Sequence, residues 1–151
     1  MNEQSVLRHE DLFHTGIVVD DLAAAKDELG ASLGVTWSEG GGEVRLLTRD
    51  GARTVRTAYA LSREGPHHIE LCQSVEGTHW TVTAPGAAHH LGYWTNDVAT
   101  TSAALLQRGM PVVAGISFGD DDAPVCAYHQ AQNGLYVEIV AHSLRRILFR
   151  D

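Results

Sequence analysis

The chain has 151 residues, of which 44% are hydrophobic, and carries a formal net charge of -8 from 11 basic and 19 acidic residues. This length suits one compact domain, and no apolar run approaches the roughly 20 residues of a membrane helix, so we expect a single domain over residues 1–151 and no membrane partner. Because an acidic surface repels a phosphate backbone, nucleic acid is excluded as an expected partner.

The first residues, Met1–Ser5, have neither the basic stretch nor the apolar stretch of a secretion signal, which favours a cytoplasmic location. The two cysteines, Cys72 and Cys126, each lie inside an apolar run. We therefore expect two small buried hydrophobic side chains rather than a disulfide framework.

A strand followed by a helix opens the chain. Phe13–Val19 reads as a short strand, Asp21 is suited to cap a helix, and Gly34 ends that helix. The apolar residues of the predicted helix share one face: Leu22, Ala25, Leu29 and Leu33. Turn signals then separate three strand-like runs: Val44–Thr48, Thr54–Leu61 and His67–Gln73.

After a linker over residues 74–87, the same order of elements returns. The segment that begins at Phe13 can be laid over the segment that begins at His89, so that His14 meets His90 and Gly16 meets Gly92. Asp97 corresponds to Asp21 and is suited to cap a second helix. Three more strand-like runs follow, with a turn at Gly119–Asp122 between the first two: Pro111–Ser117, Pro124–His129 and Leu135–Val140.

The repeat predicts an α+β fold in which two βαβββ modules form a curved mixed sheet. Module one spans residues 12–74 and module two spans residues 88–140. In the tail, residues 141–151, Leu144, Ile147 and Leu148 have helical spacing, so we expect a packing helix that could help to form a dimer.

The repeat duplicates one histidine and one glutamate in each module, namely His14 with Glu70 and His90 with Glu138. Both glutamates lie in apolar runs, and strand alternation places each on the face opposite its apolar neighbours. An unpaired carboxylate inside a curved sheet would cost several kcal/mol, which a divalent cation would offset. Two imidazoles and two carboxylates suit Zn, Ni, Co or Mn by donor type. We therefore predict one divalent metal ion held by these four side chains.

The duplicated motifs resemble those of the vicinal oxygen chelate superfamily, which includes glyoxalases, epimerases, extradiol dioxygenases and bleomycin-binding proteins. The resemblance covers nearly the whole chain and is strongest to the glyoxalase-like branch. It rests on four segments: Phe13–Leu22, Gly65–Leu71, His89–Trp94 and Asn133–Ile139. In that branch the ligands are His, Glu, His and Glu in this order, which implies His14, Glu70, His90 and Glu138. His89 is the rival for the third position, but His90 precedes Leu91-Gly92 as His14 precedes Thr15-Gly16.

The resemblance implies a metal-dependent isomerase, epimerase or lyase of glyoxalase type. Its substrate would be a small carbonyl compound that chelates the ion through two neighbouring oxygens and reacts through an enolate or enediolate. Glu138 or Glu70 would act as the base. Two alternatives stay open: a binding or resistance protein that sequesters a small molecule, and an Fe(II) extradiol dioxygenase, against which the additional Glu70 argues because such enzymes use two histidines and one carboxylate.

Strand alternation also suggests residues that contact the substrate. Trp94 shares the face of His90, His68 that of Glu70, and Tyr136 that of Glu138, so these three are predicted to bind substrate. The expected partners are a small-molecule substrate and a second copy of the chain in a homodimer. The sequence leaves open whether the two modules complete the site within one chain or across that dimer.

Overall fold

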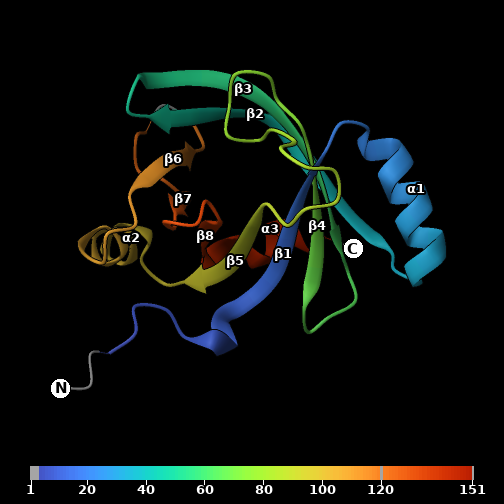
Figure 1. Ribbon diagram of the computed structural model, residues 1–151, viewed down its shortest axis with the longest axis horizontal. Helices are drawn as coiled ribbons and strands as arrows, with labels where there is room; N and C mark the ends of the chain where they lie inside the picture. The colour runs from blue at the N-terminus through green and yellow to red at the C-terminus, as the bar shows by residue number, and fades with distance from the viewer. Residues whose placement is uncertain (1–3, 120, 151) are drawn as a thin grey trace.

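The computed structural model of the chain describes residues 4–119 and 121–150 (Figure 1). Met1–Glu3, Asp120 in the predicted turn, and Asp151 in the predicted tail lie outside the described residues. The first half contains η1 (His9–Asp11), β1 (Leu12–Val19), α1 (Leu22–Leu33), β2 (Trp37–Thr48), β3 (Gly51–Ser62) and β4 (His68–Gln73). The second half contains β5 (His90–Thr95), α2 (Val98–Gln107), β6 (Val112–Ser117), β7 (Cys126–Gln130), β8 (Tyr136–Ala141), η2 (His142–Leu144) and α3 (Arg145–Leu148).

The predicted fold class is confirmed, because each half folds as strand, helix and three strands and the halves share one mixed sheet. The strands follow the order β1-β4-β3-β2-β6-β7-β8-β5, and β5 pairs with β1, so the curved sheet closes into a barrel. Within each module the first strand pairs in parallel with the last, β1 with β4 and β5 with β8. Antiparallel pairs β1–β5 and β2–β6 join the two modules. Both junctions form within one chain.

The strand β2 begins at Trp37, seven residues before the predicted run at Val44. The missed part contains Gly40, Gly41 and Gly42, and glycines ordinarily weaken a strand. Here Gly40 and Gly41 make room for neighbours on β3: a Cβ on Gly40 would lie 2.3 Å from the Tyr59 hydroxyl oxygen, and one on Gly41 would lie 2.3 Å from the Thr57 carbonyl oxygen. The glycine run therefore marks a close approach inside a long hairpin rather than a turn.

Two helices cover opposite sides of the barrel (Figure 1). The Asp21 carboxylate accepts a hydrogen bond from the Ala24 backbone N–H at the start of α1, and Asp97 does the same for the Thr100 backbone N–H at the start of α2. Gly34 ends α1 with a φ of 69°, a left-handed conformation that favours glycine. Both caps therefore act as the sequence predicted.

The tail folds as the short helices η2 and α3. Leu144 is buried, and Leu148 packs against the main hydrophobic core from its partly buried position. Across residues 4–119 and 121–150, no helix combines the length and the apolar character needed to span a bilayer.

Candidate metal centre

Strand register brings the four predicted ligands onto one face of the barrel wall. Along one cross-strand row, Glu70 on β4 lies opposite Gly16 on β1, and Gly16 lies opposite His90 on β5. Along the next row, His14 on β1 lies opposite Gly92 on β5, and Gly92 lies opposite Glu138 on β8. Paired residues point to the same side of a sheet, so each row presents one imidazole and one carboxylate separated by a glycine.

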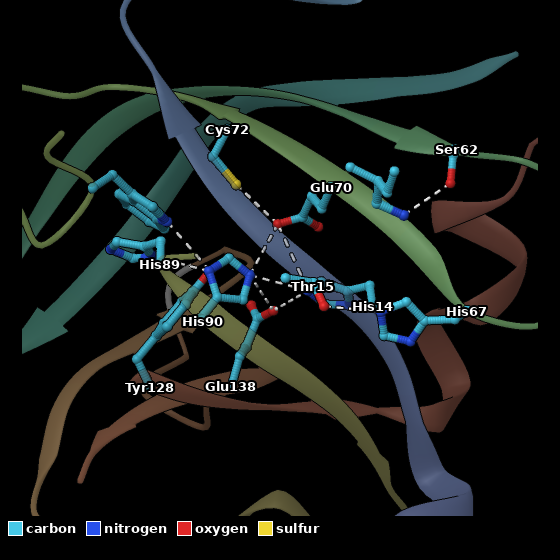
Figure 2. A network of polar contacts seen from close by, with 12 residues as sticks. His14, Thr15, Ser62, His67, Glu70, Cys72, His89, His90, Tyr128 and Glu138 are labelled. Carbon is cyan, nitrogen blue, oxygen red and sulfur yellow. Dashed lines mark hydrogen bonds and ion pairs between the residues drawn. The ribbon is translucent and has the colours of Figure 1, made fainter. Parts of the chain in front are cut away.

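The four side chains converge inside the barrel (Figure 2). The two imidazoles approach with their Nε2 atoms 3.0 Å apart. Glu138 Oε1 lies 3.2 Å from His14 Nε2 and 3.5 Å from His90 Nε2. Glu70 Oε1 lies 3.3 Å from His90 Nε2, and one ligand atom from each of the four residues lies within 4.8 Å of the others. Their exposed fractions run from 0% for His90 to 8% for Glu70, so the group is buried.

Mutual electrostatics stabilise the charged forms of this group. Burial lowers the pKa of His14, but the carboxylates of Glu70 and Glu138 outweigh burial and hold that pKa above its ordinary value. Burial raises the pKa of the Glu70 carboxyl, but the imidazoles of His14 and His90 outweigh it and bring that pKa to about 2. The protein interior thus favours a negative Glu70 carboxylate beside positive charge, which is the charge that a bound cation would provide.

The donor set fits a divalent metal ion. Glu138 Oε1, one of the facing ligand atoms, is buried and has no hydrogen-bond partner within the described part of the chain. With bonds of about 2.1 Å, donor atoms around one ion lie roughly 3.0 to 3.4 Å apart at right-angled or tetrahedral positions. Four separations between facing donors, 3.0, 3.2, 3.3 and 3.5 Å, are close to this range, and that between His14 Nε2 and Glu70 Oε1 is longer, at 3.8 Å. A cation would therefore satisfy donors that otherwise face one another.

The glycines between the ligands are part of the site. A Cβ atom on Gly92 would lie 1.9 Å from Cε1 of the His14 ring, and a Cβ on Gly16 would lie 2.0 Å from Cε1 of the His90 ring. Each module therefore supplies the space that the histidine of the other module occupies. This reciprocity explains why His-x-Gly occurs in both copies of the repeat.

The variant Gly92→Ala is expected to weaken metal binding by about 10- to 100-fold, a loss of the size seen when groups that orient ligands are changed. The added methyl group must displace the His14 ring, because nothing else can move out of its way at that distance. Zinc titration against a chromophoric chelator measures the change. Gly115→Ala on β6 is the matched control, since its Cβ would meet its nearest neighbour, Pro124 Cβ, at 3.4 Å. Equal zinc affinity in the two variants would contradict the assigned role of Gly92.

His89 lies behind His90 rather than replacing it as a ligand. Its Nε2 atom lies 2.8 Å from the His79 carbonyl oxygen, and its Nδ1 atom lies 2.9 Å from His90 Nδ1. A carbonyl only accepts, so a neutral His89 carries its hydrogen on Nε2 and accepts on Nδ1 from His90. That arrangement leaves the Nε2 lone pair of His90 free and directed at the other three ligands.

Sequence reasoning missed the thiols around the carboxylates. Cys72 and Cys126 are buried as predicted, but both line the cavity beside the four ligands, and Cys72 Sγ donates to Glu70 Oε1 over 2.9 Å. Burial and the Glu70 carboxylate raise the pKa of Cys72 well above its ordinary value, which keeps the donor protonated. Alternation along β4 could have found this contact, since Cys72 is two residues after Glu70 on the same face.

The three predicted substrate contacts lie elsewhere. Trp94 stacks on Phe13 with ring centroids 3.7 Å apart, and it lines, together with His68, a second cavity near the C-terminal helices. Tyr136 lines a third cavity beside His79 and His89. The structure therefore brings the four predicted ligands together and places these three residues outside the lining of the cavity that His14, Glu70 and Glu138 line. Their role toward substrate stays a prediction.

Comparison with known proteins gives one family. Residues 13–127 match a family model described as "Glyoxalase/Bleomycin resistance protein/Dioxygenase superfamily". Among curated proteins, no sequence matches significantly.

Solved structures show the same fold at low sequence identity. A methylmalonyl-CoA epimerase in complex with methylmalonyl-CoA and NH4+ is 19% identical with a TM-score of 0.60, covering 87% of this chain and 94% of that one. The methylmalonyl-CoA epimerase of Mycobacterium tuberculosis is 18% identical with a TM-score of 0.59, covering 93% and 92%. The 2,2',3-trihydroxybiphenyl 1,2-dioxygenase of Sphingomonas wittichii strain RW1 is 21% identical with a TM-score of 0.53, covering 86% and 41%. Identities this low establish a shared fold alone.

Proposed function

The chain belongs to the glyoxalase/bleomycin resistance protein/dioxygenase superfamily, and from that premise we propose that it is a divalent-metal-dependent isomerase, epimerase or lyase. Its substrate is a small carbonyl compound with two neighbouring oxygens. The single observation that carries the proposal is the buried convergence of two imidazoles and two carboxylates, one pair from each module. A buried group of this composition has no evident structural use, because apolar side chains would fill the same space at lower cost.

His14, Glu70, His90 and Glu138 would hold the metal, with Zn, Ni, Co or Mn matching the donors. When bound, the ion supplies Lewis acidity that makes a carbon-bound proton next to a carbonyl easier to remove. The protein residues position the donors and exclude water. Gly16 and Gly92 leave space for the imidazole rings, and His89 fixes which nitrogen of His90 faces the site.

Glu138 is the proposed base. Its Oε1 atom has no hydrogen-bond partner within residues 4–119 and 121–150, whereas Glu70 Oε1 accepts from the Cys72 thiol. Glu138 Oε1 is therefore available to take a proton from substrate, and a carboxylate positioned in this way can serve as a general base. Glu70 comes from the other module, so it can return a proton from the opposite side.

The proposal predicts metal-dependent proton exchange. Wild-type protein loaded separately with Zn, Ni, Co and Mn is incubated in D2O with hydroxyacetone and with 2-hydroxyacetophenone, two α-hydroxyketones. We expect at least one metal form to incorporate deuterium next to the carbonyl of at least one probe about 100-fold faster than the free ion at equal concentration, as NMR measures. If all four forms bind metal but none accelerates exchange, a sequestering protein becomes the better assignment.

A further inference from the structure

A cavity of about 110 Å3 extends from the metal ligands into the barrel. His14, Glu70 and Glu138 form its polar end. Most of the rest of its wall is built from aromatic, aliphatic and thiol side chains that include Trp80, Cys126, Tyr128, Ile116, Val140 and Leu148. Two polar side chains, Thr57 and Gln73, also line it, but each donates to a backbone carbonyl, of Gly42 and of Asp20. Trp80 Nε1 donates to the Tyr128 hydroxyl over 3.2 Å, so the indole N–H is satisfied within the wall.

The charged side chains in the cavity wall are acidic. Among the residues that the structure describes, no Lys or Arg side chain lines the cavity, while two carboxylates do. The positive charge of Arg150 partly offsets the rise that burial causes in the pKa of Tyr59, but Arg150 itself lies outside the cavity lining. With a divalent ion in place, the two carboxylates and the ion balance, and a further negative group on a ligand would find no cationic side chain in the lining.

The side where the cavity meets solvent is also apolar. Phe118 and Ile147 line the cavity and are 50% and 43% exposed, unusually open positions for such large apolar side chains. A charged or phosphorylated tail that extends out of the cavity would cross these two side chains. These two side chains therefore extend the apolar lining to the solvent-exposed side of the cavity.

The volume limits the size of the ligand. An apolar cavity of about 150 Å3 is known to bind benzene. At about 110 Å3, this cavity accommodates one small ring or a short branched chain, with part of the ligand extending between Phe118 and Ile147.

We propose that the site takes an uncharged, largely apolar molecule of about one six-membered ring that carries two adjacent oxygens, and that it discriminates against carboxylated and phosphorylated ligands. The two adjacent oxygens rest on the proposed function, whereas the neutral apolar body rests on the cavity alone. Catechol and 3,4-dihydroxybenzoate form a matched pair of probes, because both offer adjacent oxygens on one ring and only the second adds a carboxylate.

In calorimetric titrations of zinc-loaded protein, catechol is expected to bind at least about tenfold more tightly than 3,4-dihydroxybenzoate. The added carboxylate of the second probe would face the carboxylates of the site without a cationic side chain to pair with. The variant Ile147→Arg is expected to shrink that preference. Leu106→Arg, 56% exposed on α2 and outside the cavity lining, is expected to leave it unchanged. Equal affinities, a preference for the carboxylate, or no catechol binding at millimolar concentration would overturn the inference.

A second pair of probes separates this inference from the metal site. Benzyl alcohol and benzoate are titrated into protein stripped of metal, and metal content is measured independently. A chain that binds none of zinc, nickel, cobalt and manganese but prefers benzyl alcohol contradicts the proposed function and supports the neutral apolar cavity. A chain that binds zinc but prefers benzoate contradicts the cavity inference and leaves the metal site standing.

Discussion

Replacing Glu138 with Gln is expected to lower metal-dependent deuterium incorporation by about 10²- to 10⁴-fold, the contribution that a positioned base makes to proton transfer. The amide keeps the shape of the side chain and an oxygen that can face the metal, but it cannot accept the proton. Exchange is compared at saturating metal, with the occupancy of each protein measured, so that weaker binding is not mistaken for lost basicity. The readout is the initial exchange rate of the α-hydroxyketone probe that wild-type protein exchanges fastest.

Glu64→Gln is the control for this experiment. Glu64 accepts hydrogen bonds from the backbone N–H and the hydroxyl of Thr36 on the barrel surface, and it lies outside the cavity lining. Its replacement is expected to leave exchange unchanged. Wild-type exchange rates in a fully loaded Glu138→Gln protein would show that another group removes the proton.

Metal binding is expected to raise the midpoint of thermal unfolding by roughly 10 °C. Free metal at about 1,000 times the dissociation constant stabilises the folded chain by about 4 kcal/mol, and each kcal/mol moves the midpoint of a domain of this size by about 2 to 4 °C. The physical cause is local: without a cation, buried Glu70 and Glu138 depend on the imidazoles alone for positive charge. Differential scanning calorimetry with and without zinc measures the shift.

His90→Ala protein provides the comparison for the thermal experiment. Its own midpoint is expected to fall because a buried side chain is lost, but zinc is expected to move it by only a small part of the wild-type shift. A zinc-induced shift of the same size in both proteins would place the stabilising ion at some other site.

The repeat explains how far the sequence could predict this site. His14 and His90 occupy matching positions next to a glycine, and the strand register converts that match into facing rings. The choice between His89 and His90 could also be made from the repeat, because only His90 has a glycine two residues later as His14 does. What the repeat could not show is that His89 would bond to the ring of His90, since that contact depends on the loop that brings the His79 carbonyl near.

Other features depended on long-range packing. Alternation correctly assigns Trp94 to one face of β5, but four residues along a strand cover roughly 13 Å, and Trp94 ends against Phe13. The closure of the barrel through β2 and β6 pairs Leu46 with Ile116, and no local pattern in either segment specifies that partner. Trp80, in the predicted linker, became a buried part of the cavity wall for the same reason.

The cytoplasmic location and the homodimer remain predictions.

The most direct measurement is the metal content of wild-type and His90→Ala protein after equilibration with excess zinc and removal of unbound ions. We predict about one zinc ion per wild-type chain and less than a tenth of that in the variant, because a buried site that loses one of four ligands binds far more weakly. A wild-type chain that retains no zinc, nickel, cobalt or manganese, or a variant that retains as much as wild type, would contradict the metal centre formed by His14, Glu70, His90 and Glu138.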